Sequence, residues 1–182
     1  MAKSKGFWLF LALVAAGVAY WATRPAPQKE GLAAPDFTLK DRQERPLSLK
    51  DLRGSFAVVH FWGSWCPPCV PELPLFLAAA KRLPKNSKGA PIRWIAVSVD
   101  ESWAAADSIR PKDPALAGAA EFYLDRDAKV AEAFGTYQYP ETYVISDQGN
   151  IIAKWIGPQD WEGAWGKEAL LGIDRASLGK AL

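Results

Sequence analysis

A strongly apolar run that ends at a pair of cysteines constrains the fold of this chain more than any other feature. Residues 56–61 read Phe-Ala-Val-Val-His-Phe, a continuous run suited to a buried strand, and Cys66-Pro67-Pro68-Cys69 follows shortly after. From Val70 to Leu83 apolar side chains recur at helical spacing, with Pro74 inside the pattern. The sequence therefore predicts a central strand, a cysteine turn and a kinked helix.

The position of the cysteine pair indicates redox chemistry. Cys66 is expected at the N-terminus of the helix, where free backbone N–H groups favour a thiolate. A purely structural disulfide is one alternative, although closing so short a ring stabilises a fold by only about 2 kcal/mol. A zinc site is another, but such sites need four nitrogen or sulfur ligands, and His60 is the only histidine.

Composition limits the classes of function. With 182 residues, of which 49% are hydrophobic, the chain can bury one core, and it contains no internal repeat. The 22 basic and 20 acidic residues include four basic and one acidic residue before position 31, which leaves 18 and 19 in the rest of the chain. This near-neutral remainder argues against a nucleic-acid partner, which would require clustered basic residues.

The N-terminal segment, residues 1–23, is predicted to be a membrane anchor. Lys3 and Lys5 precede an uncharged stretch over residues 6–22. A cleavable signal segment is the alternative. Tyr20 and Trp21 favour a retained anchor, because they stand where a cleavage site needs small residues and where aromatic side chains suit a membrane interface.

The anchor prediction also suggests where the rest of the chain works. The basic residues before the uncharged stretch favour a cytoplasmic N-terminus, so the bulk of the chain is expected on the periplasmic or other extracytoplasmic side of the inner membrane. The Pro-rich residues 24–33 are interpreted as a spacer, and residues 34–182 as one folded domain. A cysteine pair in such an oxidising compartment needs redox partners.

Periodicity predicts an α/β domain with a mixed sheet covered on both faces. Trp94, Trp155, Trp161 and Trp165 are interpreted as side chains that pack in the core or at its edge. The expected strands are 36–39 with 46–49 in a peripheral hairpin, then 92–99 and 122–124, and finally 142–146 with 151–155 in a second hairpin. The expected helices are 102–109, which Ser102 caps, 129–134, and a last helix from about 161 to 170.

Four stretches carry a family resemblance. They are Ala34-Pro35-Asp36-Phe37-Thr38-Leu39, the run from Val59 to Cys69, the pair Glu72 and Pro74, and Tyr139-Pro140-Glu141-Thr142. Over residues 34–161 the chain resembles membrane-anchored thioredoxin-like proteins of the TlpA and ResA type. The Pro-Glu-Thr also resembles the CcmG or DsbE group of cytochrome c maturation. The resemblance implies a thioredoxin-like fold with an added N-terminal β-hairpin.

The resemblance implies roles for the residues around the cysteines. Cys66 is the attacking thiol and Cys69 the resolving thiol, so a redox-active disulfide replaces any cofactor or metal. Pro140 corresponds to a proline held in cis opposite the pair, with an ordinary trans proline as the alternative. The expected substrate-binding residues are Trp65, Pro67, Pro68, Tyr139, whose backbone would bind an extended peptide, and Glu141.

Two ionisable side chains compete for the handling of protons. Glu72 follows Cys69 by three residues and is expected on the same helix face, where a carboxylate would raise the thiol pKa values and carry a proton. A solvated glutamate is the alternative. His60 departs from the family, in which asparagine is common at this position. It could tune the thiolate, or it could be a neutral core histidine.

The function implied by the resemblance is a reductant of protein disulfides, for example those of apocytochrome c. Its electrons would come from a membrane donor of the DsbD/CcdA kind. A disulfide oxidase or isomerase is one alternative, and a redox-silent chaperone or copper-handling module is another. A peroxiredoxin is disfavoured, because no Pro-x-x-x-Thr-x-x-Cys pattern precedes Cys66.

Overall fold

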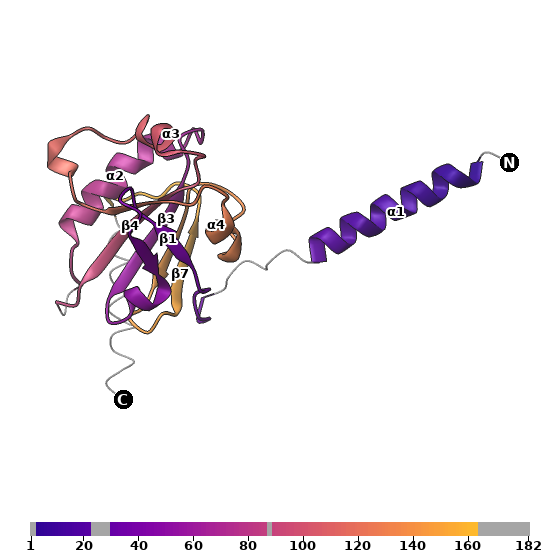
Figure 1. Ribbon diagram of the computed structural model, residues 1–182. Coiled ribbons are helices and arrows are strands. Elements are labelled where there is room, and N and C mark those ends of the chain that lie inside the picture. Colours follow the sequence, from indigo (N-terminus) through magenta and orange to yellow (C-terminus); the bar gives the residue numbers. More distant parts are fainter. Residues whose placement is uncertain (1–2, 23–29, 87–88, 164–182) are drawn as a thin grey trace.

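The computed structural model describes residues 3–22, 30–86 and 89–163. Figure 1 shows one twisted sheet with helices on both sides, and a separate N-terminal helix. The sheet has seven strands in the order β2-β1-β5-β4-β3-β6-β7. This arrangement confirms the predicted mixed sheet.

The parallel centre of the sheet consists of β3 (Phe56–Trp62), β4 (Ile92–Ser98) and β5 (Glu121–Leu124). Two antiparallel hairpins flank it: β6 (Glu141–Ile145) with β7 (Ile151–Ile156) beside β3, and β1 (Thr38–Lys40) with β2 (Pro46–Ser48) beside β5. The helices are α1 (Lys3–Ala22), α2 (Cys69–Arg82), α3 (Trp103–Asp107) and α4 (Lys129–Ala133), with short 3-10 turns at Leu49–Leu52 and Pro114–Leu116.

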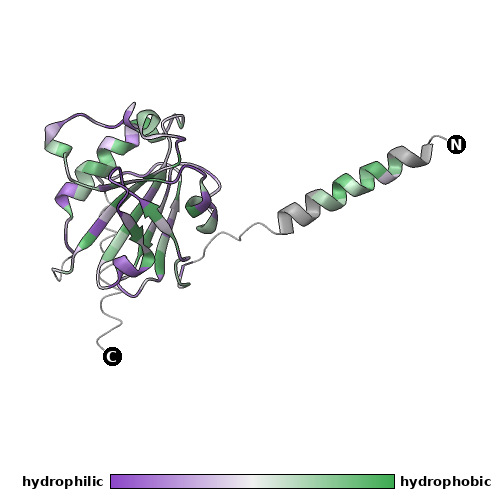
Figure 2. Ribbon diagram, in the orientation of Figure 1, coloured by the Kyte–Doolittle hydropathy of each residue, from purple (hydrophilic) through white to green (hydrophobic). Residues whose placement is uncertain are grey.

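Alternation along β3 divides the core into two layers. Val58, His60 and Trp62 face α2, whereas Val59 and Phe61 face the cluster that contains α4. Every residue of β3 is buried, as expected for a strand covered on both faces. Figure 2 shows the hydrophobic residues of the central strands between the two helix layers.

The predicted elements are found with small shifts at their ends. Pro74 lies inside α2, and the Ser102 hydroxyl accepts from the Ala105 N–H as the cap of α3. The helix α3 ends at Asp107, two residues before the predicted end. Of the predicted last helix, only residues 161–163 are described, and they are not helical. The rest of that prediction lies outside the described residues.

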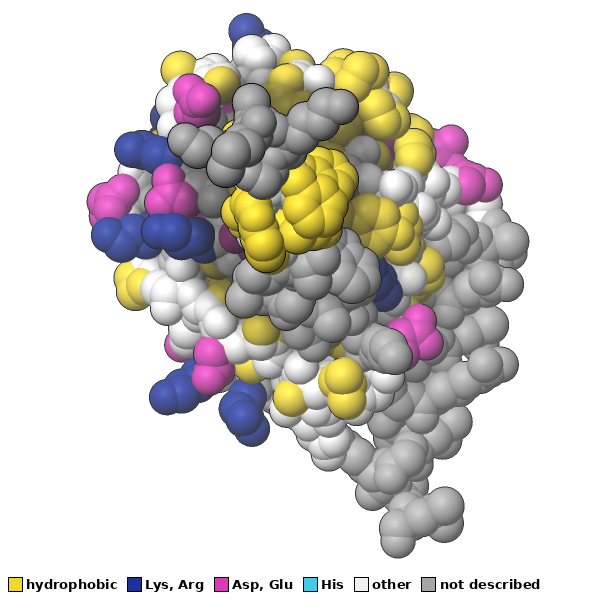
Figure 3. Space-filling model, turned by 90° about the vertical axis from the view of Figure 1, so that its right-hand side faces the viewer, with side chains coloured by type: hydrophobic (Ala, Val, Ile, Leu, Met, Phe, Trp, Pro, Cys, Tyr) yellow, Lys and Arg dark blue, Asp and Glu magenta, His cyan; other side chains and the backbone are white. Residues whose placement is uncertain are grey.

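Exposed apolar side chains characterise the described part of α1. Figure 3, viewed from the side on which α1 lies, shows hydrophobic side chains gathered at the centre of this face. The exposed large hydrophobic residues of α1 are Phe7, Trp8, Leu9, Phe10, Leu11, Leu13 and Val14. No helix among the described residues combines the length and hydrophobicity that crossing a membrane requires.

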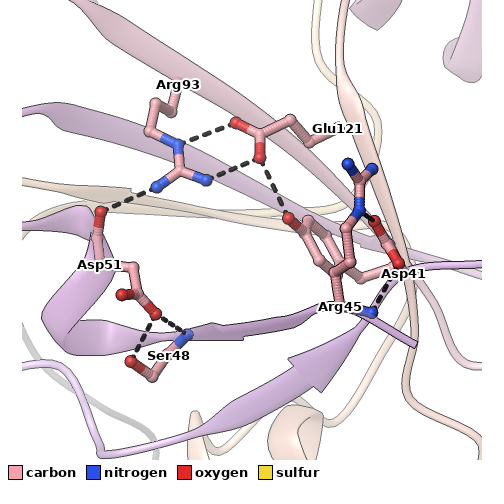
Figure 4. Close-up of polar contacts among 7 residues, drawn as sticks. Asp41, Arg45, Ser48, Asp51, Arg93 and Glu121 are labelled. Atoms are coloured by element: carbon pink, nitrogen blue, oxygen red, sulfur yellow. Dashed lines mark hydrogen bonds and ion pairs between the residues drawn. The ribbon is translucent and has the colours of Figure 1, made fainter. Parts of the chain in front are cut away.

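Polar contacts attach the N-terminal hairpin to the sheet (Figure 4). The Arg93 guanidinium donates to both carboxylate oxygens of Glu121, at 2.8 and 2.6 Å, and to the Asp51 carbonyl at 2.8 Å. The Asp51 carboxylate in turn accepts from the Ser48 N–H at 2.8 Å and from its hydroxyl at 2.7 Å. The hairpin is therefore joined to β4 and β5 at the edge of the sheet.

Candidate active site

The cysteine turn lies at the carboxyl end of β3, the central strand. Cys66 and Cys69 form a disulfide with a Cα–Cα distance of 5.3 Å. The Cys66 N–H donates to the Gly63 carbonyl at 3.2 Å, and the Cys69 N–H donates to the Cys66 carbonyl at 3.0 Å. The helix α2 begins at Cys69, so Cys66 lies in the preceding turn and not in the first helical turn. Two successive hydrogen-bonded turns, of which the second contains Pro67 and Pro68, account for this difference.

Burial distinguishes the two cysteines only slightly. Cys66 is 3% exposed and Cys69 is fully buried, so the order agrees with expectation, although Cys66 is less open than predicted. The neighbouring Trp65 is 61% exposed. Its indole lies against Gly63, where an added Cβ would be 2.8 Å from the Trp65 Cε2 atom. Glycine at position 63 therefore allows this indole to lie beside the cysteine turn.

A second loop faces the cysteine turn. The Tyr139–Pro140 peptide bond is cis, which confirms the expectation for Pro140. The pairing of Phe61 with Glu141 brings the start of β6 beside the end of β3. The Trp65 and Tyr139 rings meet edge to face at 5.5 Å between centroids. The structure thus brings together two of the predicted substrate-binding residues, while Pro67 is exposed and Pro68 half-buried beside them.

Asp100 is a site residue that the sequence analysis missed. Its buried carboxylate accepts from the Ser64 N–H at 3.0 and 3.1 Å, from the Ser64 hydroxyl at 2.7 Å and from the Ser98 hydroxyl at 2.7 Å. It follows β4, whose carboxyl end lies beside that of β3 because the strands are parallel. The expectation that β3 and β4 are neighbouring parallel strands could have identified Asp100 from the sequence, because it directly follows β4. Asp100 fixes the start of the loop that carries Cys66.

Glu72 is buried below the cysteine turn and is not solvated. It is 3% exposed, and its Oε1 accepts from the Trp161 Nε1–H at 2.6 Å and from the Gln159 N–H at 3.0 Å. Burial raises the pKa of the Glu72 carboxyl from 4.5 to about 7, and these two hydrogen bonds oppose the rise. The carboxyl can therefore exchange a proton near neutral pH.

His60 is a buried neutral histidine. Its ring stacks on Phe76 at 4.6 Å between centroids, and its Nδ1 lies 2.9 Å from the Thr142 hydroxyl. Burial lowers the pKa of His60 from 6.5 to about 3. The imidazole is therefore uncharged in the ordinary pH range, which favours the core interpretation over a proton shuttle at neutral pH.

Glu141 faces away from the thiols. Alternation along β6 places it with Tyr143 on the α4 side of the sheet, whereas Thr142 contacts His60 on the α2 side. The buried Glu141 carboxylate accepts from the Tyr143 hydroxyl at 2.6 Å and forms an ion pair with Lys154. The structure therefore does not bring Glu141 together with Glu72 and the cysteines.

The described residues assemble no group of three or more His, Cys, Asp or Glu side chains that could hold a metal ion. The Cys66–Cys69 pair is the redox group that they do provide. That the protein works without a metal or other cofactor stays a prediction.

A disulfide at the carboxyl end of the central strand, facing a cis-proline loop, defines a thioredoxin-like oxidoreductase. Solved structures agree with this fold. A putative thiol:disulfide interchange protein DsbE from Chlorobium tepidum has a TM-score of 0.66 and 23% identity, covering 80% of this chain and 98% of that one. A putative thioredoxin from Neisseria meningitidis has a TM-score of 0.62 and 28% identity, covering 79% of this chain and 91% of the other.

Residues 31–154 match the AhpC/TSA family, and the chain belongs to that family. Among curated relatives, a thiol-disulfide oxidoreductase ResA of Bacillus cereus is 31% identical, and the match covers 72% of each chain. ResA of Bacillus subtilis is 32% identical over 68% of this chain and 65% of its own length. The chain is therefore related to thiol-disulfide oxidoreductases, as the cysteine motif indicated.

Proposed function

We propose that this chain reduces disulfides in extracytoplasmic proteins by dithiol-disulfide exchange at Cys66 and Cys69. One observation carries the proposal: the redox pair lies between an exposed aromatic side chain, Trp65, and a buried carboxyl, Glu72, that can exchange protons near pH 7. The aromatic surface suits a peptide substrate, and the carboxyl suits the protons that must move with the electrons.

The reaction proceeds in two exchanges. The Cys66 thiolate attacks one sulfur of the substrate disulfide, which forms a mixed disulfide and releases the other substrate sulfur as a thiolate. The Cys69 thiol then loses its proton to the Glu72 carboxylate and attacks Cys66. This step restores the Cys66–Cys69 disulfide and releases the second substrate sulfur. Two electrons pass to the substrate. One of its thiolates takes up the Cys69 proton by way of Glu72, and the other takes a proton from solvent, equal to the one released when Cys66 ionised.

The proposed substrates are unfolded or extended segments. Tyr139 precedes the cis-proline, and its ring contacts Trp65, so a peptide bound along this loop would pass over the cysteine turn. Its backbone would pair with the substrate in the manner of an added strand. An apocytochrome c segment with a Cys-x-x-Cys-His disulfide is one substrate of this class.

The location of the reaction is also part of the proposal. Lys3 and Lys5 before an uncharged segment, together with the exposed apolar side chains of α1, support residues 1–23 as a membrane tether. Residues 24–29 would then act as the spacer, because Gly31 and Leu32 already exchange backbone hydrogen bonds with Ile151 and so belong to the folded domain. A membrane donor of the DsbD/CcdA kind would re-reduce Cys66 and Cys69 after each cycle.

The assay of this function uses the reduced full chain and two oxidised peptides. One peptide contains a Cys-x-x-Cys-His disulfide, and the other contains an unrelated disulfide in a folded hairpin. The proposal predicts stoichiometric reduction of the first peptide, and faster reduction of it than of the second. Failure of the reduced chain to reduce either peptide would contradict the proposed function.

Replacing Glu72 with Gln is expected to slow reduction of the peptide at neutral pH about tenfold to a hundredfold, because an amide cannot take the Cys69 proton. The variant should also lower the pKa of the Cys69 thiol, because the carboxylate charge that opposes its ionisation is gone. Glu132→Gln, on an exposed side chain of α4, is the matched control. Thiol titration by ultraviolet absorbance measures the second effect, and an unchanged titration would remove Glu72 from the mechanism.

A further inference from the structure

The segment that follows β7, residues 157–161, crosses from the cis-proline loop to α2, and we call it the strap. The Gly157 N–H donates to the Pro140 carbonyl at 2.9 Å. Two residues later the Gln159 N–H donates to Glu72 Oε1 at 3.0 Å. At the end of the strap, Arg82 of α2 donates to the Trp161 carbonyl at 2.7 Å. The strap therefore connects the cis-proline loop, the buried carboxyl and α2.

Trp161 is fixed within the hydrophobic core although it lies outside any helix or strand. Its side chain is fully buried. Its ring meets Phe76 edge to face at 5.0 Å between centroids, Trp94 at 5.8 Å and His60 at 5.9 Å. Because aromatic rings from α2, β4 and β3 surround the indole, the direction of its N–H is set by packing.

The Trp161 N–H reaches the same carboxyl oxygen as the strap backbone. Both donors, Trp161 Nε1 at 2.6 Å and Gln159 N at 3.0 Å, bond to Glu72 Oε1. Glu72 Oε2 is buried and has no hydrogen-bond partner among the described residues. An oxygen that accepts from two donors has little capacity to carry a proton as well, so the proton of the neutral carboxyl belongs on Oε2.

We propose that Trp161 is a positioning residue for thiol-disulfide exchange: its indole N–H holds Glu72 Oε1, so that the proton is taken up and released at Oε2. This inference rests on the proposed function. It deepens that function by naming the oxygen that exchanges the proton and the side chain that fixes it. The carboxylate is stabilised by a charge-assisted hydrogen bond that the neutral acid forms less strongly.

The other titratable and charged groups near this carboxyl come from β3, the cysteine turn and α2. His60 on β3 contacts Trp161 and stays neutral because burial lowers its pKa to about 3. The pair Cys66–Cys69 leads into α2 one turn before Glu72, and Arg82 of α2 bonds to the strap backbone. With the pair oxidised, neither cysteine titrates, so the proton affinity of Glu72 can be measured separately from the thiols.

Trp161→Phe is the variant that tests the proposal, and Trp94→Phe is its matched control. Trp94 belongs to the same aromatic cluster, but its Nε1–H donates to the Leu83 carbonyl at 2.9 Å and not to a carboxyl. Both variants remove an indole N–H and shrink the same core. Only Trp161→Phe removes a donor from Glu72.

The measurement is a carbon NMR titration of the Glu72 carboxyl in the oxidised full chain, assigned with Glu72→Gln. Trp161→Phe should move the midpoint of the Glu72 titration upward by about one pH unit, because the carboxylate loses a hydrogen-bond donor. Trp94→Phe should leave the midpoint near its wild-type position. In the Glu72→Gln background, Trp161→Phe should cause no further change in the pH profile of peptide reduction. Equal shifts in the two tryptophan variants, or no shift in Trp161→Phe, would overturn the proposal.

A measurement on the wild-type chain tests the same contact without any substitution in the core. The indole proton of Trp161 should follow the Glu72 titration in the oxidised protein, whereas that of Trp94 should not. An indole resonance of Trp161 that is unaffected by pH across the titration would overturn the proposal. Both titrations are made without substrate, so they hold or fail separately from the peptide assay that tests the proposed function.

Discussion

Replacing Cys69 with Ser is expected to stop the reaction at its intermediate, with the chain joined to its substrate through Cys66. The hydroxyl of Ser cannot resolve the mixed disulfide, and Cys69 is fully buried at the start of α2, where its sulfur bonds to Cys66. Turnover of the Cys-x-x-Cys-His peptide should fall below detection. Mass spectrometry of the full chain after incubation with the oxidised peptide would measure the covalent adduct.

Cys66→Ser is the control for the trapping experiment, because it removes the attacking thiol and should yield no adduct. An adduct in Cys66→Ser and none in Cys69→Ser would reverse the assignment of the two cysteines. The same variants, applied in cells, would identify the physiological substrate from the trapped partner. A double substitution that leaves the cellular activity intact would favour a redox-silent chaperone or copper-handling role.

His60→Asn is expected to change how the stability of the fold depends on pH. Burial lowers the pKa of His60 from 6.5 to about 3, so between these values the unfolded chain binds a proton that the native protein does not. This contribution is fully present above pH 6.5 and is lost as the pH falls through the window. From pH 7 to pH 5 the loss is about 2 kcal/mol in the free energy of unfolding.

Glu72 has the opposite dependence. Burial raises its pKa from 4.5 to about 7, so within this window the native protein binds a proton that the unfolded chain does not. Its contribution is fully present below pH 4.5 and is lost as the pH rises through 7. Between pH 7 and pH 5 it therefore gains about 2 kcal/mol on acidification, close to the amount that His60 loses. The two groups nearly cancel in the wild-type chain.

Urea unfolding at pH 7 and pH 5 would measure both contributions. Relative to wild type, His60→Asn should become more stable on acidification, because only the Glu72 dependence is left, and Glu72→Gln should become less stable. The other carboxyl groups are common to all three proteins and cancel in this comparison. A pH dependence in His60→Asn equal to that of wild type would contradict a neutral buried histidine.

The fold was largely predictable because its elements follow simple periodicities. The apolar run over residues 56–61, the helical spacing after Cys69 and the hairpin turn at residues 147–150 each describe a local structure, and all three appear. The helix α2 starts at Cys69, one residue before the predicted start, but the two consecutive turns that separate β3 from the helix and leave Cys66 ahead of its first turn were not predicted. Turn geometry depends on backbone hydrogen bonds that periodicity does not encode.

The site was predictable in its chemistry but not in its contacts. The cysteine pair and the spacing of Glu72 pointed to redox chemistry, yet the partners of Glu72 come from residues 159 and 161, far along the chain. Asp100 likewise reaches Ser64 only because β3 and β4 lie side by side. These contacts depend on strand order and on the path of the strap, and neither has a local sequence signal.

Glu141 illustrates how the face of a strand decides the role of a residue. Its position beside Pro140 suggested a place near the thiols, but alternation along β6 turns its side chain to the α4 face, where it pairs with Lys154. The preceding loop fixes that alternation, and a shift of one residue would reverse it. Sequence proximity to the cis-proline was therefore a poor guide.

Equilibration of the full chain with glutathione buffers of graded potential, followed by alkylation and mass spectrometry, tests the central claim most directly. The account predicts one reversible two-electron transition of Cys66 and Cys69, at a potential nearer to thioredoxin's about −270 mV than to the about −120 mV of the strong oxidant DsbA. A pair that does not interconvert, or a transition close to that of DsbA, would contradict a reductant that acts by dithiol-disulfide exchange.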